Sequence, residues 1–189
     1  MVKKVLLFSF LMTMLCTSLG MASDFREAEW GMSKEQVKKL EKSDPLFLQN
    51  ETLTFKGKVA NSAVHIIYEF ADNQLKKGTY KFTTNRVNPN VYLQDYAKVN
   101  EFLELKYGKP EYNKETWHND VYKEKRGYHG LAIANGHLRL ESSWESDKTI
   151  IVHLLSGNNS IIDHNITYYD KSVQDIPREK IEIEGMQGL

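Results

Sequence analysis

Apolar and polar residues alternate along residues 63–84, the stretch around which the chain is organised. In residues 64–70 every second side chain is large and apolar, and the alternation returns at Tyr80 and Phe82. A period of two is typical of a strand that buries one face. Asp72-Asn73 favours a turn between the two strands, because short Asx side chains bond their own backbone. We therefore predict an antiparallel hairpin with an aromatic, core-facing surface that other elements must cover.

One helix is predicted before this hairpin and one after it. Ser33 is a natural N-cap and Gln36 completes a capping box, so a first helix is expected over residues 34–42. A longer helix is expected to start at Asn88-Pro89 and to end at Gly108. One apolar stripe at helical spacing runs along this longer helix: Tyr92, Tyr96, Val99, Phe102 or Leu103, and Lys106.

The remaining pattern predicts strands. They are expected at residues 52–59, 116–122, 128–134, 137–144, 149–155 and 161–169. Asn135-Gly136 is the strongest short-range signal for a two-residue hairpin turn. Consecutive hairpins favour an α+β fold, an antiparallel sheet with two main helices packed on one face. The order of helix, three strands, helix and further strands suggests a duplicated α-β-β-β unit.

Domain organisation follows from the same pattern. Residues 23–173 are expected to form a single α+β domain, with halves at 23–87 and 88–173 if the unit is duplicated. Residues 174–189 show no convincing period and are expected to form a flexible tail.

Residues 1–22 have the pattern of a signal peptide. A positive start is followed at residues 5–15 by an apolar run too short to cross a bilayer as a helix. Small residues place the expected cleavage before Ser23, and an uncleaved anchor is the competing interpretation. A lipid anchor at Cys16 is not expected, because the bulky Leu15 precedes it. We expect an exported bacterial protein, periplasmic or secreted, with no transmembrane segment after cleavage.

Composition excludes several classes of function. The expected signal peptide holds two lysines and no acid, which leaves 23 basic against 25 acidic residues, so nucleic acid is not an expected partner. The single cysteine lies in that signal peptide, which excludes disulfides, a thiol nucleophile and a cysteine metal site from the remainder. The chain contains no G-x-S-x-G elbow, no H-E-x-x-H and no phosphate-binding glycine loop. We expect no cofactor and assign no catalytic residues.

Three short motifs, at a helix start, a hairpin and a helix end, resemble those of known proteins. The start FREAEWGMSKEQVKKLE, the hairpin YEFADNQLKKGTYKF and the helix end FLELKYGKP resemble a group of uncharacterised exported bacterial proteins with a W-G-M-S-x-x-x-V start. More distantly, the G-M-S-x-x-x-V segment is similar to the outer-membrane assembly lipoproteins (SmpA/OmlA, BamE-like) and to the β-lactamase-inhibitor fold. This resemblance implies a protein-binding, non-enzymatic role and brings no catalytic residues. The chain departs from the lipoproteins because it lacks their lipid-bearing cysteine.

Histidine is the remaining candidate for chemistry. His137, His153 and His164 fall on three successive predicted strands, and one pairing register would place all three on one sheet face, as a zinc site requires. The alternative is three half-exposed histidines on the polar face, bonded to water or to Arg139 and Glu141. A register slip of one residue moves the whole set to the other face.

The sequence thus predicts a non-enzymatic module that binds another envelope protein or a small ligand. The alternative function is a periplasmic metal-binding protein or metal-dependent hydrolase that uses the three histidines. The aromatic residues Tyr68, Phe70, Tyr80 and Phe82 are expected to point inward and fill the core rather than to line a ligand groove.

Overall fold

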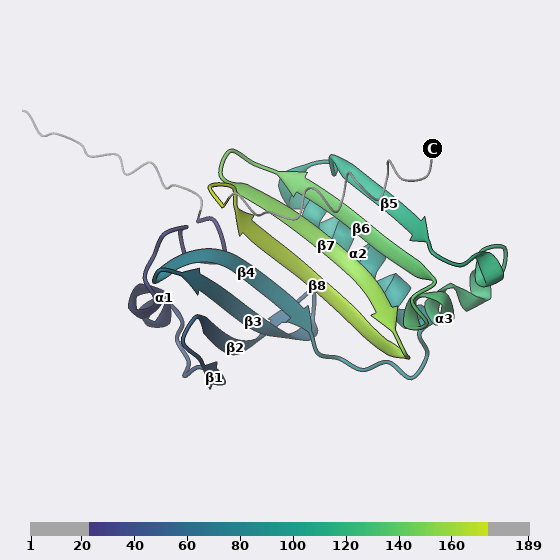
Figure 1. The fold of residues 1–189 in the computed structure, drawn as a ribbon, viewed down its shortest axis with the longest axis horizontal. Coiled ribbons are helices and arrows are strands. Elements are labelled where there is room, and N and C mark those ends of the chain that lie inside the picture. Colours follow the sequence, from purple (N-terminus) through teal and green to yellow (C-terminus); the bar gives the residue numbers. More distant parts are fainter. Residues whose placement is uncertain (1–22, 174–189) are drawn as a thin grey trace, which may run out of the picture.

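The computed structural model describes residues 23–173, which form an α+β fold with one antiparallel eight-stranded sheet (Figure 1). The elements are α1 (Lys34–Leu40), β1 (Phe47–Leu48), β2 (Thr52–Val59), β3 (Ser62–Ala71), β4 (Gln74–Phe82), α2 (Asn90–Tyr107), β5 (Tyr112–Trp117), two single-turn 3-10 helices (Asp120–Tyr122 and Arg126–Tyr128), α3 (His129–Ala134), β6 (Leu138–Glu145), β7 (Thr149–Asn158) and β8 (Ile161–Asp170). The α+β class predicted from the sequence is confirmed. The expected signal peptide and the expected tail lie outside the described residues.

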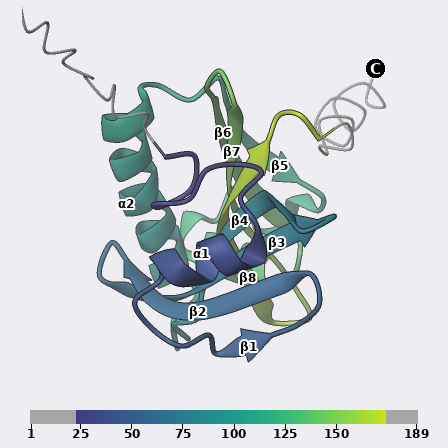
Figure 2. The same cartoon turned by 90° about the vertical axis from the view of Figure 1, so that its left-hand side faces the viewer.

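The strand order is symmetric about its centre. From one edge to the other it runs β1-β2-β3-β4-β8-β7-β6-β5, so two four-stranded meanders meet where β4 pairs with β8. This central pairing extends from Lys77 opposite Tyr169 to Lys81 opposite Asn165. Figure 2 shows that the sheet twists strongly between the β2 side and the β6 side, as the right-handed twist of strands accumulates. The two meanders therefore depend on a pairing between residues far apart in sequence.

The central hairpin forms as the alternation predicts. Val64 pairs with Phe82 and Ile66 with Tyr80, which places the apolar residues of β3 and β4 on one face. Asp72 and Asn73 both adopt left-handed backbone conformations, with φ of 50° and 56°. The hairpin prediction is therefore confirmed, together with the exact span of β2 at residues 52–59.

Both predicted helices form, with shifted ends. Ser33 and Gln36 make the expected capping box, and α1 ends at Leu40, two residues before the predicted end. The longer helix α2 begins at Asn90 and stops at Gly108, whose φ is 84°. Of the two candidates for its apolar stripe, Leu103 is buried, and Phe102 points to solvent.

The predicted strand at residues 128–134 is wrong, because these residues form α3. Asn135-Gly136 ends this helix instead of turning a hairpin: the amides of Gly136 and His137 bond the carbonyls of Ile133 and Ala132. A left-handed glycine after a helix leaves the same local signature as one in a hairpin turn. The strand predicted at residues 116–122 is also misplaced, since β5 ends at Trp117.

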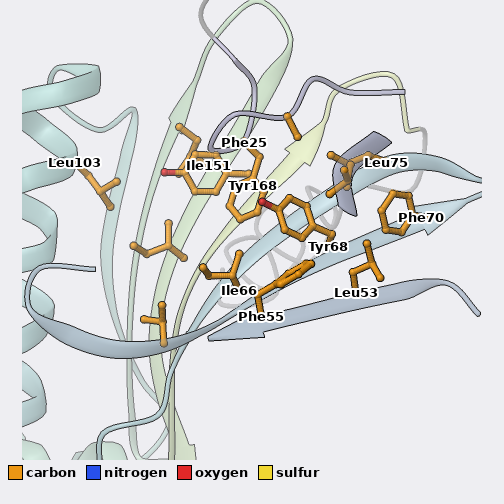
Figure 3. Close-up of a cluster of buried hydrophobic side chains, with 14 of the residues drawn as sticks. Phe25, Leu53, Phe55, Ile66, Tyr68, Phe70, Leu75, Leu103, Ile151 and Tyr168 are labelled. Carbon is orange, nitrogen blue, oxygen red and sulfur yellow. The ribbon is translucent and has the colours of Figure 1, made fainter. Parts of the chain in front are cut away.

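The main hydrophobic cluster lies on one face of the sheet, and Phe25, near the start of the described chain, lies within it (Figure 3). Phe25 sits among Tyr68, Tyr80 and Tyr168, with ring centroids 5.0–5.1 Å apart. Its ring lies over Gly78, where an added Cβ would fall 2.2 Å from the ring. The absence of a side chain on β4 therefore creates the space that Phe25 fills.

Residues from α1 and α2 contribute to this same cluster. Val37 of α1 and Val99 and Leu103 of α2 are buried in it, beside the aromatic residues of β3. The inward orientation predicted for the four aromatic residues is confirmed: Tyr68 and Phe70 are buried, and Tyr80 and Phe82 are partly buried against the cluster. A second, smaller cluster joins α2 and α3 to β6 and β7 around Tyr96 and Ile133.

Candidate functional site

Two of the three candidate histidines meet in the core. On β7 His153 lies opposite Ile166, and on β8 His164 lies opposite Leu155, so both side chains share the inward face. Their Nε2 atoms are 2.9 Å apart. His153 is fully buried, and only 3% of His164 is exposed. We call these two residues the histidine pair.

A chain of hydrogen bonds links the histidine pair to α2. The side-chain amide of Asn100 donates to Ser142 Oγ at 2.9 Å, so its Oδ1 is free to accept from His153 Nδ1 at 2.5 Å. His153 then carries its proton on Nδ1, and its Nε2 accepts from the Nε2–H of His164. Ser142 also bonds the hydroxyl of Tyr96 at 2.9 Å. The network ties the middle of α2 to β6, β7 and β8.

Aromatic rings enclose the histidine pair and exclude water. Tyr96 stacks on His153 and Phe82 stacks on His164, with centroids 4.1 and 4.0 Å apart. Burial lowers the pKa of both imidazoles, that of His164 to about 4, because a buried charge loses its hydration. Burial also raises the pKa of Tyr96 to about 12. At neutral pH both imidazoles are therefore uncharged. The network is a buried hydrogen-bond network that connects elements of the core, and it is not a site open to a substrate.

His137 does not join the pair. It precedes β6, stacked on Tyr122 at a centroid distance of 5.6 Å, five residues before the Ser142 that lies opposite His153. At about 3.3 Å per residue this separates it from His153 by roughly 16 Å along the strand direction. The predicted arrangement of three histidines on one face is therefore wrong. Within residues 23–173 no three histidine, cysteine, aspartate or glutamate side chains are placed to hold a metal ion.

The alternative interpretation of the histidines is also wrong for the pair, which lies in the core and not on the polar face. Glu141 bonds Arg139 on the opposite side of the sheet and contacts neither imidazole. His137 keeps a buried Nδ1 for which the described residues supply no hydrogen-bond partner.

Three consecutive exposed apolar residues lie at the edge of the sheet. Leu46 is 36%, Phe47 56% and Leu48 60% exposed, and Phe47 and Leu48 make up the whole of β1. Phe47 lies opposite Thr54, and Leu48 lies opposite the buried Leu53, so their side chains point to opposite faces. We call these three residues the β1 edge.

The backbone of the β1 edge is also open. The amides of Leu46 and Gln49 bond the carbonyls of Thr54 and Thr52 on β2. Bonded and non-bonded pairs alternate along an antiparallel ladder, and Gln49 forms a bonded pair with Thr52, so in the adjacent pair Leu48–Leu53 the amide and carbonyl of Leu48 point away from β2. Beyond β1 the edge of the sheet passes to β2, where Lys56 is exposed. This edge combines unpaired backbone groups, apolar side chains and nearby positive charge.

Two hollows in the described surface are less suited to chemistry. One, of about 380 Å³, is lined by Arg26, Glu41 and Tyr68 among others. There the guanidinium of Arg26 pairs with Glu41 at 2.8 Å, and the Tyr68 hydroxyl donates to the same carboxylate. The other, of about 440 Å³, includes the exposed Val87 and Ile161 and lacks a nucleophile paired with a base.

Sequence reasoning missed the β1 edge, although a signal was present. Three large apolar residues follow Pro45 directly and precede a polar turn, and this run belongs to no predicted helix or strand.

No helix among residues 23–173 is long and apolar enough to span a membrane. Comparison with protein-family models, with curated proteins and with solved structures finds no match.

Proposed function

We propose that this protein is an exported, non-enzymatic binding module that captures an extended segment of another protein of the bacterial cell envelope at its β1 edge. The observation that carries the proposal is the set of exposed apolar side chains on a strand whose outer backbone groups are unpaired. Natural proteins usually protect such edges, because they template the addition of another strand. An unprotected edge of this kind fits recognition by β-augmentation.

The chemistry of the edge defines the partner segment. Apolar residues beside Phe47 and Leu48 would pack on both faces, and acidic residues farther along would meet Lys56 and Lys58, which are exposed on β2. A second copy of this chain fits less well. A two-residue strand buries far less than the about 800 Å² per partner of a standard stable interface.

The exported location rests on the signal-like pattern of residues 1–22 and on the cysteine-free remainder. The resemblance to exported bacterial proteins and to the BamE-like and β-lactamase-inhibitor groups points to the same role, since those proteins bind other proteins.

We also infer that the sheet descends from a duplicated unit. The symmetric strand order supports this, because α1 is followed by β1 to β4, and α2 by β5 to β8 with two 3-10 helices and α3 inserted after β5. Val37 and Val99 share one cluster, which supports the packing of both main helices on one face of the sheet. In such a fold β1 and β5 occupy equivalent edges. The first is apolar, and the second carries Lys114 and Glu115.

Site-specific photo-crosslinking tests the proposed function. A benzophenone amino acid replaces Phe47 in the exporting bacterium, and a second strain carries it at Glu115 on the opposite edge as the matched control. We expect one envelope protein to be crosslinked at position 47 and not at 115. A synthetic peptide of the crosslinked segment should then bind the purified protein.

Two variants of one residue separate strand addition from simple hydrophobic contact. Leu48→Pro removes an amide that faces away from β2, so it leaves the β1–β2 ladder intact and is tolerated on an edge. Leu48→Ala removes the side chain and keeps the amide. We expect the proline variant to weaken peptide binding at least tenfold and the alanine variant to weaken it less. Unchanged binding by the proline variant, or crosslinks only between two copies, contradicts the proposal.

The metal-dependent alternative has less support. His153 and His164 have their facing nitrogens bonded to each other, and His137 lies apart. Elemental analysis of the gently purified protein tests this alternative: a stoichiometric metal that is lost in a His153→Gln variant would favour it over the binding module.

A further inference from the structure

Strand β7 carries aliphatic residues on both faces. Ile151 and Leu155 point into the core, and Ile150, Val152 and Leu154 occupy the opposite face, which we call the outer face. A strand with one solvated face alternates apolar and polar residues, whereas a strand covered on both sides is apolar throughout. The pattern of β7 therefore indicates a cover on the outer face.

Burial on the outer face indicates the same cover. Ile150 is 6% exposed, Thr167 beside Val152 is 6% exposed, and Glu141 opposite Leu154 is 5% exposed. A carboxylate on an open sheet surface normally stays in water. Figure 1 shows α2 on the far side of β6 and β7, and no helix of residues 23–173 lies over the near side.

We propose that residues 174–189 of the same chain cover the outer face of β6, β7 and β8. The described chain leaves β8 at the place this requires: the amide of Lys171 bonds the carbonyl of Lys148, directly before β7. From there, residues 174–189 can extend over about 50 Å at roughly 3.3 Å per residue, more than the length of β7.

The sequence of this segment fits the outer face. Ile181 and Ile183 alternate with Glu182 and Glu184, which gives one apolar side to lie on the aliphatic residues of β7. Residues 174–189 carry four acidic and two basic residues. Their net negative charge complements Lys114, which lies opposite Glu141 on the outer face of β5.

Solvent paramagnetic relaxation tests this inference on residues 23–189 with labelled isoleucine, leucine and valine methyl groups. A soluble gadolinium chelate relaxes only methyl groups near water. We expect Ile150, Val152 and Leu154 to be protected in the unmodified protein. In the variant Ile181→Asp/Ile183→Asp we expect their relaxation enhancement to rise at least twofold. The buried Ile151 and Leu155 are internal references and should not change.

A matched control changes the other side of the same segment. Glu182→Gln/Glu184→Gln keeps the isoleucines, so the outer-face methyl groups should stay protected. The inference is overturned if the outer-face methyl groups of the unmodified protein relax as fast as those of Ile161, which is 74% exposed. Protection that survives the isoleucine changes, or that disappears on dilution, also overturns it, since the cover would then be another surface or a second copy.

Discussion

Acidification from pH 7 to pH 5 should destabilise this protein through the histidine pair. Burial holds the pKa of His164 at about 4 in the folded state, against 6.5 for an ordinary histidine, and lowers that of His153 in the same direction. As the pH falls through 6.5 the unfolded chain takes up protons that the folded chain cannot accept. Stability from the pair is therefore complete above pH 6.5 and is lost as the pH falls towards 4.

The magnitude follows from the shift in the pKa of His164. Between pH 7 and pH 5 this residue alone should lower the free energy of unfolding by about 2 kcal/mol, and by about 3 kcal/mol at pH 4. Solvent screening does not reduce this figure much, because only 3% of the residue is exposed. His153 adds to the loss. Carboxylates with lowered pKa values, such as Asp170, lose their contribution only at lower pH.

Urea denaturation at pH 7, 6 and 5, followed by tryptophan fluorescence, measures the effect. The variant His153→Leu/His164→Leu should be nearly insensitive to pH across this range, even if it starts less stable because Asn100 loses its donor. His118→Gln is the matched control, since His118 is exposed and belongs to no part of the network. A pH dependence that is equally steep in the double variant would refute the reasoning.

Further substitutions test the packing of the core and the cap of α1. Gly78→Ala should lower the free energy of unfolding by about 2 kcal/mol or more, because its Cβ would meet the Phe25 ring, and Phe25→Ala should lower it by about 3–5 kcal/mol. The double variant should lose clearly less than the sum of the two single losses. Chemical denaturation of the unmodified protein and the three variants measures this difference. Gly130→Ala should destabilise α3, because its Cβ would lie 2.4 Å from the backbone before α2, whereas Gly127→Ala meets nothing and should be neutral in the same thermal melts. Ser33→Ala should cost about 1 kcal/mol through loss of the capping box, and a loss below the error of chemical denaturation would contradict that role.

Elements set by local pattern could be predicted from the sequence. The hairpin around Asp72-Asn73 and the capping box at Ser33 depend on neighbouring residues, so their signals are complete within a short stretch. Gly136 shows where local information fails. Its left-handed conformation is compatible with a hairpin or with a helix end, and the packing of Gly130 against the backbone before α2 favours the helix.

The candidate sites depended on long-range pairing that the sequence does not display. Only the register of β7 against β8 brings His153 to His164, and the same register places both in the core. The sequence pattern predicts His137 on a neighbouring strand, whereas in the structure it precedes β6 and lies beyond the reach of the pair. The β1 edge was missed because two residues are too few to show a period.

The position of Phe25 has a consequence for the order in which the protein can be completed. This ring, near the start of the described chain, touches Tyr168, near its end. During synthesis from the N-terminus, the strand that carries Tyr168 emerges last among the described elements, and until then β4 is paired with β3 alone and Phe25 lacks one wall of its pocket. A chain released early would expose the open edge of β4 to proteases, so the contact between Phe25 and Tyr168 distinguishes finished copies from unfinished ones.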